Sequence, residues 1–307
     1  MKGILIILVV IGHLVTSETK IHQLIYWFHM PVFFMITGIL SSWGIDDLSF
    51  VKKRVSSLVV PYFSWCILLF LIFWIENPLK YLGRILYGGA MNTTAYTYPF
   101  WFVCALFVSS IVFNWFKRRN VKWLYGVLTI FLLLWYTVLC RCQIPPLPWS
   151  IEVIPFVLLY FVIGIYANKL SEKNLIAPVI ISMILVIVLI LCLHNGIIDY
   201  KLGMKSHHLT NILFDTIVPT IFFFSLKEIC LVLSKIKILN SLLSFIGKAS
   251  LVIMFIHVTI LHIMNKLNIA DSYSLDLLKV LVVSLVGCLV YMMCQKNKKV
   301  SLLFLGK

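Results

Sequence analysis

Three histidines lie in or beside an otherwise apolar run near the start of the chain. Residues 11–38 read IGHLVTSETKIHQLIYWFHMPVFFMITG and contain His13, His22 and His29. Histidine exchanges protons near neutral pH, so such residues favour general acid–base chemistry. The alternative interpretation of each is a hydrogen bond to a neighbouring helix.

The spacing of these histidines brings them near one another. His22 and His29 are seven residues apart and share one stripe of a helix. His13 and His22 flank a loop of about five residues, so they can approach each other across a helical hairpin. Pro31 frees a backbone carbonyl one turn upstream and predicts a kink. We therefore take His13 and His29 as candidate catalytic residues, with His22 as their outer neighbour.

A basic cluster precedes the third apolar segment, in the stretch FVKKRVSSLVVPYF. It consists of Lys52, Lys53 and Arg54. One interpretation is a signal that orients the chain in the membrane. The other is a phosphate site at the membrane face, where arginine offers two parallel donors. Pro61 predicts a bent start to the segment that follows.

Later apolar segments hold further candidates. Glu152 and Asp215 lie near the outer ends of their segments, where either can orient a histidine, bind a sugar hydroxyl or contact water. His257 lies deep in another segment. Trp101 closes an aromatic group at 96–101, which indicates an interfacial aromatic belt or a surface that stacks on a sugar.

The composition is that of a polytopic membrane protein. Of 307 residues, 62% are hydrophobic and 12% are charged, whereas soluble chains are about half apolar and about a quarter charged. The eight cysteines lie mostly in apolar runs and form no zinc or redox spacing, so we expect no metal. We predict an all-α bundle of about ten transmembrane helices, over residues of about 2–16, 22–43, 57–76, 99–116, 122–140, 148–167, 175–194, 209–233, 242–265 and 276–295.

The connections between these segments predict an orientation. Those on one side carry most of the 26 Lys and Arg residues, which makes that side cytoplasmic and places both termini there. Most of the net charge of +15 then faces anionic lipid, so membrane lipid is the expected partner and nucleic acid is not. We expect one transmembrane domain over residues 1–300 and a short cytoplasmic tail at 301–307.

The chain resembles the membrane acyltransferase family 3, ten-span bacterial proteins that O-acylate sugars. The resemblance covers nearly the whole chain in order. Its more specific part is KGILIILVVIGH, FHMPVFFMITG and FVKKRVSSLVVPY, and its softer part is YPFWFVCALF, PFVLLYFVIGIYANK and IGKASLVIMFIHVTI.

The resemblance implies a reaction and a place in the cell. The acyl group, commonly acetyl from acetyl-CoA, is moved to a hydroxyl of a cell-envelope or extracellular polysaccharide or its lipid-linked precursor, in the bacterial inner membrane. Acyl-CoA is then a co-substrate, no cofactor is tightly bound, and polysaccharide-assembly proteins are further partners. His13 matches the histidine that ends the family's first span and is thought to be catalytic there. His29 matches the histidine of the segment FHMP.

The family's basic motif is matched only in part. It has two arginines three residues apart; Arg54 matches the first, and Ser57 stands in place of the second. We therefore expect Lys52 and Lys53 to share in binding the acyl donor. Glu152, Trp101 and His257 remain candidates for the acceptor site.

Two other classes of protein fit the same residues. Transporters and flippases also have broken helices and ionisable groups near the membrane midplane, although no paired halves with matching interruptions are evident here. A scaffold of a polysaccharide-assembly complex is the third interpretation, and it predicts that replacing His13 leaves activity intact.

Overall fold

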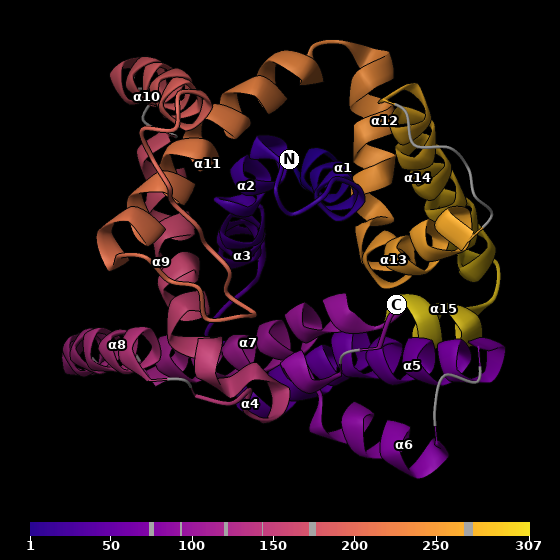
Figure 1. Ribbon diagram of the computed structural model, residues 1–307. Coiled ribbons are helices and arrows are strands. Elements are labelled where there is room, and N and C mark those ends of the chain that lie inside the picture. Colours follow the sequence, from indigo (N-terminus) through magenta and orange to yellow (C-terminus); the bar gives the residue numbers. More distant parts are fainter. Residues whose placement is uncertain (74–76, 93, 120–121, 143, 172–175, 267–272) are drawn as a thin grey trace. The chain divides into compact units, whose positions relative to one another are not determined.

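The computed structural model describes residues 1–73, 77–92, 94–119, 122–142, 144–171, 176–266 and 273–307 (Figure 1). Within these residues every named element is helical. The α-helices are α1 (Lys2–Leu14), α2 (Lys20–Tyr26), α3 (His29–Leu40), α4 (Asp47–Arg54), α5 (Val60–Phe73), α6 (Pro78–Tyr87), α7 (Trp101–Arg119), α8 (Lys122–Arg141), α9 (Ile154–Ser171), α10 (Ile176–His194), α11 (Ile212–Ser234), α12 (Lys237–Lys248), α13 (Ser250–Lys266), α14 (Tyr273–Gln295) and α15 (Lys298–Leu305). A π-helix, η1, covers Val55–Val59, and short 3-10 helices cover Gly89–Met91 (η2), Tyr98–Phe100 (η3) and Pro148–Val153 (η4).

The described part of the chain is helical in each of the ten predicted segments, which confirms an all-helical membrane protein, while the number of ten spans stays a prediction. In the described part of the chain, six helical stretches are long and apolar enough to cross a membrane: Lys20–Leu40, Asp47–Phe73, Tyr98–Arg119, Pro148–Leu170, Ile212–Ser234 and Asp276–Gln295. The pair α12 and α13 makes a seventh when counted as one broken span. Three more apolar helices are shorter: Lys2–Leu14, Ile130–Leu139 and Val179–His194.

The helices form two compact units. The first unit consists of Met1–Ser41, Tyr136–Gln143 and Phe156–Lys248, and the second of Ser42–Trp135, Ile144–Pro155 and Ala249–Lys307. Both units are discontinuous in sequence, so the chain passes between them several times.

In the first unit, α3 and α9 pack closely because a glycine lies at each side of their contact. A Cβ atom on Gly38 would lie 2.6 Å from the carbonyl oxygen of Phe161. A Cβ atom on Gly164 would overlap the backbone of Met35. Small residues allow helix backbones to approach in this way, which compensates for the weak hydrophobic drive between helices in lipid.

The helix of the second predicted span is broken upstream of Pro31, which confirms the predicted kink. Helix α2 ends at Tyr26 and α3 begins at His29. Pro31 lies in the first turn of α3, where its missing N–H has no partner to lose. In Figure 1 α1, α2 and α3 are the three indigo helices next to the N-terminus.

In the second unit, the C-terminal helix packs against the start of the third span. Trp65 donates its indole N–H to the carbonyl of Phe304 at 3.2 Å. Gly306 ends α15 with a φ of 68°, and a Cβ there would meet the backbone of Ser56 and Ser57. Residues 301–305, predicted as part of a tail, therefore belong to α15. The π-helix η1 lies between the basic cluster and Pro61, where the sequence predicts a bend; such turns often mark functional positions.

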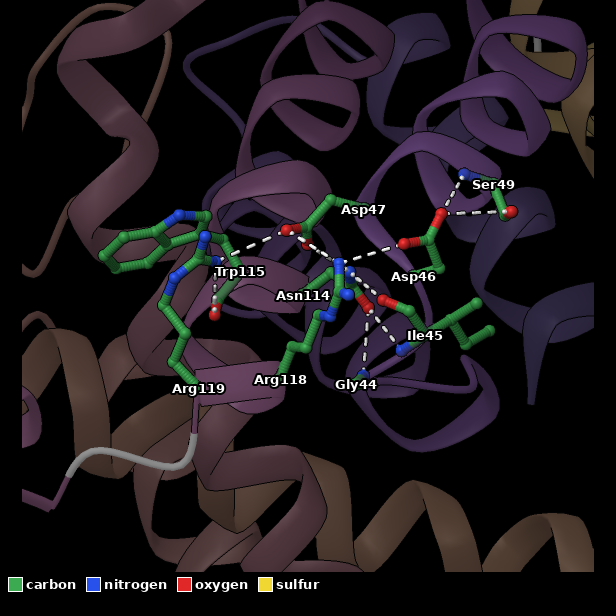
Figure 2. Close-up of polar contacts among 9 residues, drawn as sticks. All are labelled: Gly44, Ile45, Asp46, Asp47, Ser49, Asn114, Trp115, Arg118 and Arg119. Atoms are coloured by element: carbon green, nitrogen blue, oxygen red, sulfur yellow. Dashed lines mark hydrogen bonds and ion pairs between the residues drawn. The ribbon is translucent and has the colours of Figure 1, made fainter.

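Asn114 joins α7 to the segment that precedes α4 (Figure 2). Its side-chain oxygen accepts the backbone N–H groups of Gly44 and Ile45, at 2.9 and 3.2 Å. Its amide group donates to the carbonyl of Ile45 at 2.9 Å and to the carboxylate of Asp47 at 3.3 Å. Because Asn114 is only 1% exposed, these bonds replace water in a buried site.

Ion pairs surround this contact on its exposed side. One guanidinium nitrogen of Arg118 lies 3.1 Å from a carboxylate oxygen of Asp46 and 3.1 Å from one of Asp47. Asp46 also accepts the backbone N–H of Ser49, and this bond is the main reason that its pKa is lowered, with Arg118 adding to it. Exposed ion pairs stabilise a fold only weakly, so the buried amide is the stronger link.

Replacing Asn114 with alanine is expected to lower the free energy of unfolding by about 2 kcal/mol or more, because buried backbone groups lose their side-chain partners. The measurement is the thermal midpoint of the purified protein in detergent. Asn195→Ala is the matched control, since the amide of Asn195 only donates to a carbonyl one turn back on an exposed surface. Equal midpoints for the two variants would contradict this role of Asn114.

Candidate active site

Tyr26 lies at the centre of the three histidines in the first unit. Its ring stacks on His22, with ring centroids 3.9 Å apart and planes at 19°. It meets His29 edge-on, with centroids 4.7 Å apart. Its hydroxyl oxygen lies 3.4 Å from Nδ1 of His13. The two histidines predicted to be catalytic therefore contact the same side chain.

Sequence reasoning missed Tyr26, although its spacing carries a signal. Tyr26 follows His22 by four residues and precedes His29 by three, which places all three on one stripe of a helix. An aromatic residue in an apolar run is typical of a packed helix core, so the sequence alone did not indicate a role for the Tyr26 hydroxyl.

Backbone hydrogen bonds place a hydrogen on Nδ1 of both His29 and His22. His29 is buried, and its Nδ1–H donates to the carbonyl of Ile25 at 2.8 Å. The Nδ1–H of His22 donates to the carbonyl of Gly12 at 2.9 Å. In each ring, Nε2 then carries the lone pair and is the nitrogen that can act as a base.

His13 is held differently from the other two. It lies in the last turn of α1. Its Nδ1 faces the hydroxyl of Tyr26, which can either donate or accept a hydrogen bond. His13 is half-buried and is thus the most accessible of the pair His13 and His29.

A second stripe of α2 holds the end of α10 and the connection that follows it. The ammonium group of Lys20 donates to the carbonyl of His194. Gln23 and Trp27 both donate to the carbonyl of Tyr200, at 2.8 and 2.6 Å. Residues 20, 23 and 27 form one helical stripe, while the stripe of residues 22 and 26 carries the histidine cluster.

Asp215, predicted to orient a histidine or contact water, is buried among tyrosines instead. Its carboxylate accepts the hydroxyl of Tyr136 at 3.1 Å, and its backbone carbonyl accepts that of Tyr160 at 2.7 Å. Burial and the neighbouring Asp215 raise the pKa of Tyr200, so this phenol stays protonated at neutral pH. Asp215 thus lies beside Tyr200, whose carbonyl accepts the hydrogen bonds from α2.

The basic cluster belongs to the second unit, and its three members differ. Lys52 and Lys53 are exposed at the end of α4. The guanidinium of Arg54 packs over the rings of Phe50 and Trp43, at 5.0 and 5.7 Å from their centroids. Such stacking orients the guanidinium plane while its edge remains able to donate hydrogen bonds.

Glu152 supports a strained turn in the second unit. Its carboxylate accepts the N–H of Leu147 at 3.2 Å, and its carbonyl accepts the indole N–H of Trp135 at 2.8 Å. Between them, Trp149 and Ser150 both adopt a φ of 55°. Non-glycine residues in this conformation need support from their surroundings, and such turns often lie at functional sites.

The other two acceptor candidates lie elsewhere in the second unit. Trp101 is buried at the start of α7. His257 is fully buried in α13, and its Nδ1–H donates to the carbonyls of Ile253 and Met254 at 3.0 and 2.8 Å. Trp101, Glu152 and His257 thus lie on three different elements.

The sequence matches the model of a family described as an acyltransferase domain, over residues 1–293. The chain belongs to this family. The nodulation protein NolL of Mesorhizobium japonicum is 35% identical over 137 residues, which cover 39% of this chain and 36% of that protein. NolL of Sinorhizobium fredii is 32% identical over 146 residues, which cover 40% and 37%. No solved structure matches.

Family membership confirms the resemblance and the class of acyltransferase, and it favours a transferase over a transporter or scaffold. The chain spans a little over a third of the length of the curated relatives it matches. The matched family region includes both the histidine cluster and the basic cluster.

In the double variant Gln23→Ala, Trp27→Phe, the carbonyl of Tyr200 loses two hydrogen-bond donors, each worth about 1 kcal/mol. We therefore expect the connection 195–211 to open at least about tenfold more often than in wild type. The measurement is the rate at which trypsin cleaves after the two lysines of this connection in the detergent-purified protein.

The control is Gln295→Ala, which removes an amide that donates to Tyr291 at 2.9 Å in the second unit. An unchanged rate of cleavage in the double variant would show that these bonds do not hold the connection.

Proposed function

We propose that this protein is an integral-membrane O-acyltransferase of the bacterial inner membrane. It transfers an acyl group, acetyl from acetyl-CoA, to a hydroxyl of a cell-envelope or extracellular polysaccharide or its lipid-linked precursor. The observation that carries this proposal is the cluster in which His13 and His29 contact Tyr26, within a chain of the acyltransferase family.

The proposal includes ten spans with both termini in the cytoplasm. The distribution of Lys and Arg supports this orientation. It places Lys52 and Lys53 on the cytoplasmic side, where acyl-CoA is found, and His13 towards the outer side, where the acceptor hydroxyl arrives. Membrane lipid and polysaccharide-assembly proteins are the partners that go with this location.

The chemical step assigns His13 as the general base. Nε2 of His13 takes the proton of the acceptor hydroxyl while its oxygen forms a bond to the thioester carbonyl carbon. The carbon–sulfur bond then breaks, and the thiolate of CoA leaves and takes the proton from His13. An ester and free CoA are the products, so atoms and charge balance.

The role of His29 follows from its hydrogen bond. Because its Nδ1–H is held by Ile25, neutral His29 offers only a lone pair at Nε2. It can donate to an oxyanion only after it gains a proton. In its neutral form it instead supports the ring of Tyr26, which it meets edge-on.

Replacing His13 with alanine is expected to lower acylation by about 10²–10⁴-fold, because the general base is lost. The measurement is the O-acyl mass on envelope glycan from cells with matched membrane levels of wild type and variant. His208→Ala, on the exposed connection after α10, is the control. Full acylation in the His13 variant would overturn the mechanism, and a glycan whose O-acylation never depends on the protein would overturn the function.

The exposed lysines of the basic cluster predict a salt-dependent affinity for the donor. We expect Lys52→Ala, Lys53→Ala to raise the KM for acetyl-CoA about three- to tenfold at low salt, with less effect near physiological salt. The measurement is labelled acetyl transfer in isolated membranes at two ionic strengths.

The matched control removes two other exposed lysines, Lys298 and Lys299 of α15, which lie in the same unit. An equal rise in KM for both pairs of substitutions would show that the effect comes from general surface charge and not from a donor site at Lys52 and Lys53.

A further inference from the structure

We propose that Tyr26 is a positioning residue whose hydroxyl holds the reactive histidine, His13, in the tautomer and orientation needed for proton transfer. The inference rests on the proposed acyltransferase function and deepens it.

The geometry gives the ring and the hydroxyl of Tyr26 separate tasks. The ring is fixed on one side by stacking on His22 at 3.9 Å and on another by the edge contact with His29 at 4.7 Å. Both histidines are themselves tied to backbone carbonyls, those of Gly12 and Ile25. The phenol is thus held by its ring, and the direction of its hydroxyl is set before substrate binds.

The hydroxyl of Tyr26 points at Nδ1 of His13, at 3.4 Å. For His13 to act through Nε2, its Nδ1 must carry the hydrogen, which then donates to the tyrosine oxygen. When Nε2 takes the proton from the acceptor hydroxyl, Nδ1–H becomes part of an imidazolium. Its hydrogen bond to the tyrosine oxygen is then charge-assisted and stronger than before. The contact is therefore worth more in the transition state than in the ground state, which raises the rate without tighter binding of substrate.

The hydrogen bond from His22 to Gly12 supports this arrangement from the other side. Gly12 directly precedes His13, so the bond ties the last turn of α1 to α2. A Cβ on Gly12 would lie 3.3 Å from the ring of Tyr26 and 3.3 Å from the side chain of Ile25. The lack of a side chain at this position lets the phenol approach the backbone next to His13.

The test compares Tyr26→Phe with wild type in isolated membranes, by transfer of labelled acetyl from acetyl-CoA to envelope glycan. We expect the maximal rate to fall about tenfold. The acetyl-CoA concentration for half-maximal rate and the thermal midpoint should stay within error, because phenylalanine keeps both ring contacts. In a His13→Ala background, Tyr26→Phe should cause no further loss, since the hydroxyl acts through His13.

The matched control is Tyr81→Phe. It removes a different tyrosine hydroxyl, a buried one that donates to the backbone carbonyl of Cys66 at 3.0 Å in the second unit. Wild-type rates in Tyr26→Phe would overturn the inference and leave only a stacking role. The inference would also be overturned if Tyr26→Phe lowered the rate by the same factor in the His13→Ala background. It would likewise be overturned if the rate fell only to the extent that the thermal midpoint fell.

A second measurement needs no assumption about the reaction. Carbethoxylation of His13, followed by peptide mass spectrometry of the detergent-purified protein, reports whether its ring nitrogens are engaged. The reagent attacks the unprotonated ring nitrogen, which is Nε2 in the proposed tautomer, and donation from Nδ1–H to the tyrosine oxygen makes Nε2 more basic. We therefore expect slower modification of His13 in Tyr26→Phe than in wild type, and no change in Tyr81→Phe. If the wild-type protein transfers no acetyl group, the proposed function is overturned. If His13 is modified at the same rate in Tyr26→Phe as in wild type, the contact between Tyr26 and His13 is overturned.

Discussion

The hydrogen bond from His29 to the carbonyl of Ile25 is the interaction on which the candidate site depends. A break in a membrane helix leaves backbone groups that hydrocarbon cannot satisfy. Here the carbonyl of Ile25, at the break between α2 and α3, accepts the backbone N–H of Phe28 at 3.3 Å and the imidazole of His29 at 2.8 Å. The same bond fixes the ring of His29 against Tyr26. One contact thus closes the break and orients the aromatic centre of the cluster.

Helix α2 is only two turns long, yet it serves two neighbours because its faces are divided. One stripe presents His22 and Tyr26 towards the end of α1. The other presents Gln23 and Trp27 to the carbonyl of Tyr200. An isolated helix of this length is unstable, so α2 owes its form to contacts on both sides. A substitution on one stripe is therefore expected to weaken the contacts of the other stripe as well.

The sequence predicted the all-helical membrane fold and the kink above Pro31, because hydropathy and proline act locally. The proximity of three histidines followed from their spacing. What it could not predict depends on which atoms meet across the chain. Glu152 was expected at an acceptor site, and the structure places its carboxylate on the N–H of Leu147, in support of a turn. A count of charges has the same limit, because it counts Arg118 as a cation without showing that it pairs with Asp46 and Asp47.

The basic residues near α4 have two different environments. Arg118 and Arg119 pair with Asp46 and Asp47 around the buried amide of Asn114, so these arginines link α7 to α4 (Figure 2). The exposed lysines at the end of α4 have a different environment, beside the stacked guanidinium of Arg54. The acidic pair thus neutralises Arg118 and Arg119, while Lys52 and Lys53 remain exposed at the end of α4. Under the proposed function, these two exposed lysines are the positive charges that attract a phosphate-bearing donor, and they lie just before the π-helix η1.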